Sequence, residues 1–141
     1  MIDGNSPLAV QAKATAMLGL AIPANQWVVL DFVQREIDTH QAISPGPIWR
    51  WVAPMRGVYH LVTTIRLDGP GSPTWRLRVL KSGQVVAEAS FAGASGQIAW
   101  LGVMNQEDLQ VQIWGSVTLV LSIQQPVLPA TIAIAGVGVA L

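Results

Sequence analysis

Few residues in this chain are able to do chemistry, and most of them lie in one polar segment. His40 follows Asp38 by two positions and Glu36 by four, and a histidine beside two carboxylates supplies the ligand types of a metal site. The alternative is a solvated polar loop, which the composition of 34–47 favours. His60 lies among apolar residues and is expected to be packed or at an interface. We therefore predict neither a metal site nor a cofactor.

The sequence shows no arrangement of catalytic residues. No serine and aspartate accompany either histidine in a pattern that predicts a Ser-His-Asp triad. Gly69 and Gly71 flank a proline and mark a turn, whereas a phosphate-binding loop opens into a helix. Cysteine is absent, which rules out a disulfide scaffold and a thiolate zinc site. We predict that the protein is not an enzyme.

Tryptophan is the remaining residue type with a recognisable chemistry, and the chain has six. Trp49, Trp51 and Trp75 lie on predicted strands and are expected in the core or in an interface. An exposed tryptophan would instead offer a flat platform that stacks on a sugar ring. The candidates for such a platform are Trp27, Trp49 and Trp114. A glycan is therefore kept as an alternative partner.

The charge content of the chain is low and balanced. Only 11% of the residues are charged, whereas about 25% is usual, and the net charge is zero. A nucleic-acid-binding protein would carry a basic excess, and a membrane span would need about 20 consecutive apolar residues. The sequence has neither, so we predict no nucleic-acid partner and no membrane partner. Asp3 and Lys13 interrupt the pattern of a secretory signal peptide, and we expect none.

The segment 49–67 organises the predicted fold. Pro54 cannot donate to a sheet ladder and marks the end of a first strand, and Gly57 suits a turn with positive φ. From Val58 onward the residues alternate with the period of a strand. One face is expected to hold Tyr59, Leu61, Thr63, Ile65 and Leu67, and the other His60, Val62, Thr64 and Arg66. We predict that the two strands form a central hairpin.

Similar alternation recurs along the chain. Strands are predicted within 27–32, 75–80, 85–91, 97–103, 109–113, 117–123 and 130–141. The segment 8–20 is rich in alanine, which favours helix, but its apolar residues alternate, and we predict a strand. The segment 34–47 is predicted to be a long loop with one short strand at 36–38. The result is an all-β sandwich or barrel of roughly eight to ten antiparallel strands, in a single domain over 8–141 after a flexible arm at 1–7.

No charged residue follows Asp108, although three predicted strands lie in that part of the chain. A strand with one solvated face normally carries some lysine or glutamate, and uncharged edges invite unwanted pairing. A subunit interface would explain this composition, because interface cores are depleted of charge. The alternative is that these strands lie in the centre of the sandwich with both faces covered. We favour the interface, because Ala133, Ala135 and Gly136 suit close backbone approach near a symmetry axis.

Several motifs match one known family, in order, over nearly the whole chain. The most characteristic is an aromatic residue, a proline and a Gly-hydrophobic-Tyr-x-hydrophobic run, found here at Trp51, Pro54, Gly57, Tyr59 and Leu61. Further matches lie at 9–12, 22–27, 30–32, 77–84, 101–111 and 131–136, with Ser82 in place of the usual asparagine and Glu107 in place of the usual glycine. The chain thus resembles the globular head of complement component one-q and the related tumour necrosis factor ligands.

This resemblance implies a jelly-roll sandwich that assembles as a tight homotrimer. The uncharged strands would then pack around the threefold axis. The residues expected at the trimer interface are Tyr59, Leu61, Leu109, Val111, Ile113, Trp114, Leu119, Leu121, Ile132, Ile134, Val137 and Val139. Some members of the family bind calcium through carboxylates near the top of the trimer. The corresponding candidates here are Glu36, Asp38 and Asp68, although we predict no metal ion.

Short chains of this kind, without a signal peptide or a collagen stalk, recur in bacteriophage virions as decoration, fibre or spike modules. The resemblance therefore implies a homotrimeric capsid decoration protein, made in the host cytoplasm and located in the virion. Its partner would be the major capsid protein or another virion protein. The residues of the arm and the long loop expected to reach this partner are Ile2, Asp3, Asn5, Arg35, Glu36 and His40.

The resemblance leaves two further functions open. The first is a carbohydrate- or receptor-binding adhesion module, at the tip of a tail fibre or spike or as a lectin-like domain. The second is a signalling ligand of the tumour necrosis factor type, which the missing secretion signal disfavours.

Overall fold

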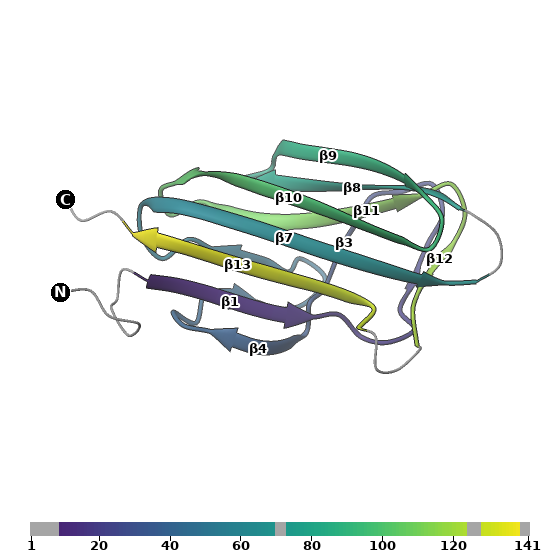
Figure 1. Cartoon of the computed structure of the whole chain (residues 1–141), viewed down its shortest axis with the longest axis horizontal. Helices are drawn as coiled ribbons and strands as arrows, with labels where there is room; N and C mark the ends of the chain where they lie inside the picture. Colours follow the sequence, from purple (N-terminus) through teal and green to yellow (C-terminus); the bar gives the residue numbers. More distant parts are fainter. Residues whose placement is uncertain (1–8, 70–72, 124–127, 139–141) are drawn as a thin grey trace.

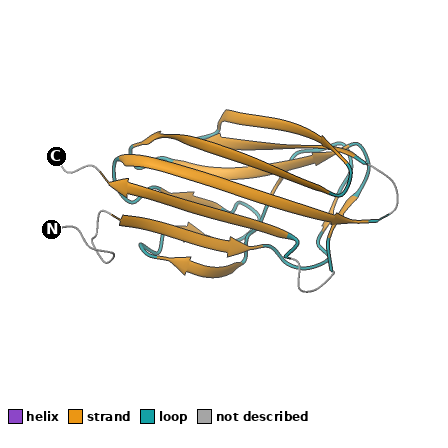
Figure 2. Cartoon of the chain, viewed as in Figure 1, coloured by secondary structure: helices purple, strands orange, loops and turns teal. Residues whose placement is uncertain are grey.

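The computed structural model describes residues 9–69, 73–123 and 128–138, and all regular structure in them is β-strand (Figures 1 and 2). No helix of these residues is long and apolar enough to cross a membrane. The strands of the described residues are β1 (Ala9–Thr15), β2 (Ala21–Ile22), β3 (Val28–Val29), β4 (Gln34–Asp38), β5 (Ile43–Ser44), β6 (Arg50–Val52), β7 (Gly57–Asp68), β8 (Thr74–Lys81), β9 (Gln84–Ala92), β10 (Ser95–Met104), β11 (Asp108–Gly115), β12 (Leu119–Leu121) and β13 (Ala130–Gly138).

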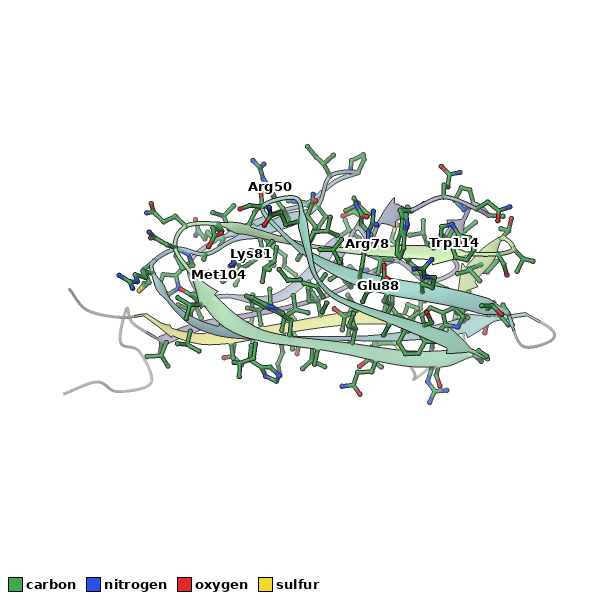
Figure 3. The ribbon with its side chains drawn as sticks, turned by 90° about the horizontal axis from the view of Figure 1, so that it is seen from above. Arg50, Arg78, Lys81, Glu88, Met104 and Trp114 are labelled. Carbon is green, nitrogen blue, oxygen red and sulfur yellow. The ribbon has the colours of Figure 1, made fainter. Side chains whose placement is uncertain are left out.

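Two antiparallel sheets stack as the layers of a sandwich (Figures 1 and 3). The seven-stranded sheet has the order β2–β12–β7–β13–β1–β4, and β10 pairs with β7 along the edge opposite β13. The six-stranded sheet has the order β5–β6–β11–β8–β9, and β3 pairs with β11. The described chain begins and ends side by side, because Ala9 of β1 pairs with Val137 of β13.

The inward faces of the two sheets form one hydrophobic core. The alternation predicted from Val58 onward is confirmed, since every second residue of β7 from Tyr59 to Leu67 is buried. Aromatic side chains fill the space between the layers. The Trp51 ring lies edge-on to the Tyr59 ring at 5.2 Å, and the Trp49 ring lies edge-on to the Phe32 ring at 5.0 Å. The prediction that these tryptophans are packed is therefore confirmed for the core.

The predicted central hairpin is wrong. β6 pairs with β5 and β11 in the six-stranded sheet, whereas β7 belongs to the seven-stranded sheet. The segment around Pro54 therefore carries the chain from one layer to the other, and the Tyr59 hydroxyl fastens it by donating to the Met55 carbonyl oxygen at 2.6 Å. Gly57 is also not a positive-φ residue. A glycine is needed there because an added Cβ would collide with the Val137 carbonyl oxygen.

The structure also corrects three predictions about the extent and number of strands. The segment 8–20 forms a strand only as far as Thr15, and the segment 27–32 only over Val28–Val29. The predicted long loop 34–47 holds two strands, β4 and β5, and the whole described chain accordingly has more short strands than expected. Asp38 shapes the turn between β4 and β5, since its two carboxylate oxygens accept hydrogen bonds of 2.9 Å from the backbone amides of Ala42 and Ile43.

Candidate functional site

The outward face of the seven-stranded sheet carries an unusual set of side chains. β10, β7, β13 and β1 lie next to one another in this order, and their pairing register aligns the outward residues in rows across the sheet. The first three rows are Val103–Val58–Val137–Ala9, Leu101–His60–Ala135–Gln11 and Ala99–Val62–Ala133–Lys13. We call these three rows the apolar face.

Four large aliphatic side chains of the apolar face are open to solvent in the single chain. The exposed fractions are 47% for Val58, 66% for Leu101, 57% for Val103 and 59% for Val137. The next row, Gln97–Thr64–Thr131–Thr15, is polar, so the apolar residues gather at one end of the sheet. A contiguous exposed apolar patch with a polar rim is typical of a surface that binds another protein.

The apolar face bears little charge. Its ionisable side chains are Lys13 at the β1 border and His60 in the second row, where Leu101 and Ala135 lie directly opposite the histidine. Its alanines, at positions 9, 99, 133 and 135, lie on β1, β10 and β13, and their short side chains let a second surface approach the backbone closely. Such a surface is able to approach a second copy of itself without bringing like charges together, except at Lys13 and His60.

The structure corrects most of the predicted trimer interface. Nine of the twelve residues are at most 2% exposed within the single chain, and so belong to its own core: Tyr59, Leu61, Leu109, Val111, Ile113, Leu119, Leu121, Ile132 and Ile134. A strand's side chains alternate between faces, so a shift of one residue along β7 or β13 moves the whole set from the core to the surface. Val137 does lie on the apolar face, Trp114 lies on the other sheet, and Val139 is outside the described residues.

The residues that the sequence missed are Val58, Leu101 and Val103. Near this end, β7 and β10 carry apolar residues on both faces. On β7, Val58 and Val62 lie on the same face as His60. On β10, Leu101 lies on one face, and its sequence neighbours Trp100 and Gly102 lie on the other. A strand of an ordinary two-layered sandwich is polar on its outward face. The signal in the sequence for an apolar outward face was that two adjacent strands carry apolar residues at both odd and even positions.

The predicted contact residues of the long loop lie on or just after β4, the edge strand that pairs with β1 beside the apolar face. Arg35 and Glu36 are exposed on the edge strand β4, and the His40 ring is 2.8 Å from the Thr39 hydroxyl through Nδ1. Among the described residues, no group of three or more histidine, aspartate or glutamate side chains is placed to hold a metal ion. The predicted arm residues Ile2, Asp3 and Asn5 lie outside the described residues.

A second distinctive surface lies on the outward face of the six-stranded sheet. Trp27 and Trp114 are half-buried there beside Arg76 and Arg78, and Figure 3 shows Arg78, Glu88 and Trp114 close together on this side of the molecule. The prediction that Trp49 contributes to an exposed platform is wrong, because this side chain is fully buried against Phe32. Trp27 and Trp114 are partly exposed and remain candidates for the platform.

Comparison with known proteins identifies the fold. The PRD1 vertex protein P5 superposes with a TM-score of 0.59 at 15% identity, over 94% of this chain and 96% of that chain. Murine APRIL gives a TM-score of 0.57 at 12% identity, over 90% and 98% of the two chains. The Eiger TNF of S. frugiperda gives 0.55 at 10% identity, over 95% and 94%. The fold is a tumour necrosis factor-like jelly roll.

The jelly-roll class predicted from the sequence is thereby confirmed. No family model matches the chain, and no curated protein matches it in sequence. At these low identities the structural likeness shows the fold alone. Function therefore has to be argued from the surfaces of this jelly roll.

Proposed function

We propose that this jelly roll is a non-enzymatic structural protein of a phage virion, which works as a homotrimer and decorates the capsid. The observation that carries the proposal is the apolar face, where Val58, Leu101, Val103 and Val137 are open to water in the single chain. Membership of the virion is supported by the likeness in fold to the PRD1 vertex protein P5. The trimer is supported by the family that the sequence resembles.

In the proposed trimer, three copies of the apolar face meet around the threefold axis. Complete burial of a valine or leucine side chain contributes about 1.5–3 kcal/mol, and these side chains are roughly half exposed, so each would contribute about 1 kcal/mol. Four such side chains in each of three copies supply a substantial driving force for association. The small residues of β13 let the backbones of neighbouring copies come close, and Val137 keeps its predicted place in the interface.

The second part of the proposal concerns the contact with the virion. The described chain begins at Ala9, in the same row as Val58 and Val137, so the segment 1–7 is connected to the apolar end of the sheet. Ile2, Asp3 and Asn5 of this arm, with Arg35, Glu36 and His40 at the β4 edge, are proposed to contact the major capsid protein or another virion subunit. Contacts of this kind stabilise a shell because they bind its assembled state.

The test of the proposal is the size of the protein in solution when the apolar face is altered. Val103→Asp places a carboxylate in the first row, and we expect it to convert the trimer into monomers in analytical ultracentrifugation. The matched control is Val85→Asp, because Val85 is a valine of similar exposure, 48%, on β9 of the other sheet. A trimer that persists in Val103→Asp would contradict the proposed interface.

A further inference from the structure

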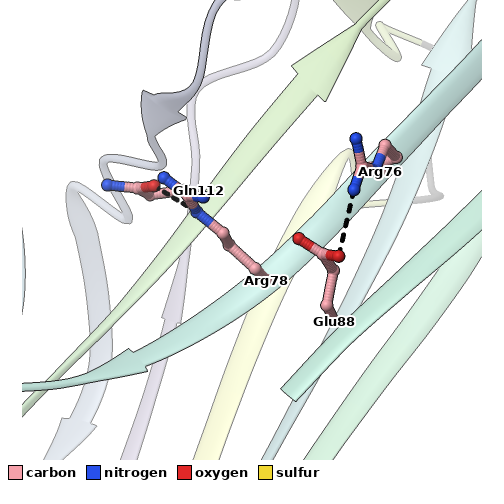
Figure 4. A network of polar contacts seen from close by, with 4 residues as sticks. All are labelled: Arg76, Arg78, Glu88 and Gln112. Carbon is pink, nitrogen blue, oxygen red and sulfur yellow. Dashed lines mark hydrogen bonds and ion pairs between the residues drawn. The ribbon is translucent and has the colours of Figure 1, made fainter. Parts of the chain in front are cut away.

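The outward face of the six-stranded sheet presents a compact group of aromatic and cationic side chains. In the pairing register, Arg76 of β8 lies opposite Trp114 of β11, and Arg78 lies opposite Gln112. Trp27 precedes β3, which pairs with β11 next to Gln112. We call Trp27, Arg76, Arg78, Gln112 and Trp114 the Trp–Arg platform, and Figure 4 shows its polar contacts.

The two arginines of the platform are held in fixed positions. The Arg78 guanidinium carbon is 4.0 Å from the centroid of the Trp27 ring, and its Nε donates to the Gln112 Oε1 at 2.7 Å. The Arg76 guanidinium carbon is 5.5 Å from the Trp27 ring and 5.9 Å from the Trp114 ring. Cation–π contacts and hydrogen bonds of this kind order long side chains before any ligand arrives, which lowers the entropic cost of binding.

The platform has one positive charge without a partner. Glu88 of β9 lies directly across from Arg78 in the register, but its Oε2 accepts a hydrogen bond of 3.0 Å from Arg76 Nη2 instead. Among the described residues Arg78 makes no ion pair within 4.0 Å, and its Nε is occupied by Gln112. The two Nη groups of Arg78 are therefore the donors left for an incoming anion, and their planar spacing matches a carboxylate.

We propose that the Trp–Arg platform binds a saccharide unit that carries a carboxylate. The carboxylate pairs with the Nη groups of Arg78, the apolar face of the sugar ring lies against the exposed parts of Trp27 and Trp114, and Gln112 and Glu88 bond hydroxyl groups. This combination of flat aromatic surface with a few placed polar groups is typical of small-ligand sites. The inference is independent of the proposed trimer, because the platform and the apolar face lie on different sheets.

Two rival occupants fit the platform less well. A protein partner needs a larger surface with an apolar centre, whereas β3, β8 and β11, described over their whole length, contribute none of the exposed large hydrophobic residues. A single-stranded nucleic acid would stack its bases on the indoles but needs several cations for its phosphates, and this platform has one unpaired guanidinium.

The experiment titrates the full chain with 3′-sialyllactose and trigalacturonate by isothermal titration calorimetry. Lactose and the methyl ester of trigalacturonate serve as the neutral counterparts. At least one acidic probe is expected to bind about tenfold or more tightly than its neutral counterpart, because a bidentate pair with arginine is lost in the latter. The two probes distinguish a sialylated glycan from a uronate polymer as the source of the carboxylate.

Variants assign the binding to the platform. Arg78→Gln is expected to weaken binding of the acidic probe about tenfold, and Arg78→Lys to restore only part of it, because lysine keeps the charge but loses the planar fork. Trp114→Ala is expected to weaken acidic and neutral probes alike. Arg56→Gln is the matched control, since Arg56 is an exposed arginine in the turn between β6 and β7, and it should bind as the unaltered protein does. Circular dichroism confirms that each variant is folded.

Several results would overturn the inference. Equal binding of acidic and neutral probes would show that Arg78 does not recognise the carboxylate. The absence of binding heat from either acidic probe at about 10 mM would show that the platform is not a saccharide site of useful affinity. Full binding by a folded Arg78→Gln variant would place the site elsewhere. Tighter binding of a thymidine hexanucleotide than of either acidic saccharide would assign the platform to nucleic acid instead.

Discussion

Val58 of β7 and Val137 of β13 are direct neighbours across two paired strands, and both point away from the core of their own chain. Val103 of β10 lies on the other side of Val58, so three valines from three strands form one exposed row. Their buried sequence neighbours, such as Tyr59 and Met104, already fill the sandwich. The protein therefore has a complete core and, in addition, an apolar surface on the outside of the same sheet.

The first prediction separates the core from this outer surface. In the Val103→Asp background, Leu61→Ala should lower the free energy of unfolding by about 2–5 kcal/mol, because it leaves a cavity in the core. His60→Ala, one residue away on the outward face, should change it by less than about 0.5 kcal/mol, as is usual for surface positions. Urea denaturation followed by tryptophan fluorescence measures both. Comparable losses in the two variants would mean that the assignment of the two faces is wrong.

A second prediction concerns the alkaline stability of the chain through its single tyrosine. Burial of the Tyr59 hydroxyl raises the pKa of this group above 10.0. The folded state therefore keeps the proton at a pH where the unfolded chain has released it. Since the folded state then binds more protons, the stability that Tyr59 contributes is present below pH 10 and declines as the pH rises through and above this value.

The measurement is a pair of urea titrations between pH 9 and 11.5 on the unaltered protein and on Tyr59→Phe. The difference between the two proteins isolates the contribution of the tyrosine. Tyr59→Phe should be less stable by about 1 kcal/mol at pH 8, through loss of the bond to Met55, and should show a shallower alkaline decline. If the free energy of unfolding declined equally with pH in the two proteins, the effect predicted for Tyr59 would be contradicted.

The third prediction concerns the arm. Removal of residues 1–7 should leave the oligomer unchanged, because the apolar face begins at Ala9 and lies within the described domain. The same truncation should abolish cosedimentation with virions, since Ile2, Asp3 and Asn5 are proposed to contact a neighbouring subunit. A matched truncation at the other end, of residues 140 and 141, controls for the effect of shortening the chain. Undiminished cosedimentation after loss of the arm would show that the contact is made elsewhere.

How much of this structure the sequence predicts depends on the range of the interactions involved. The alternation of Tyr59, Leu61 and Ile65 is a local property, and it correctly predicts which residues of β7 share a face. The same alternation does not say which of two apolar faces is the core when Val58 and Val62 occupy the other side. The assignment of Tyr59 and Leu61 to a subunit interface failed for this reason.

The remaining differences between the predictions and the structure arise from the pairing of strands that are far apart in the sequence. A short break at Pro54 looks the same in sequence whether the chain turns back into one sheet or crosses to the other. The Trp–Arg platform likewise depends on β3 pairing with β11 and on β8 pairing with β11, which bring Trp27, Arg78 and Trp114 together from distant parts of the chain. Trp27 and Trp114 are identified in the sequence as candidates for a platform, but their arginine neighbours are visible only in the fold.

The solution mass of the unaltered protein, measured by multi-angle light scattering over a dilution series, is the direct test of the self-association proposed for the apolar face. The chain mass is 15.0 kDa, and we predict a mass three times this value that persists on dilution. A mass of one chain at every concentration would contradict the proposal, because Val58, Leu101, Val103 and Val137 would then remain exposed in the working state of the protein.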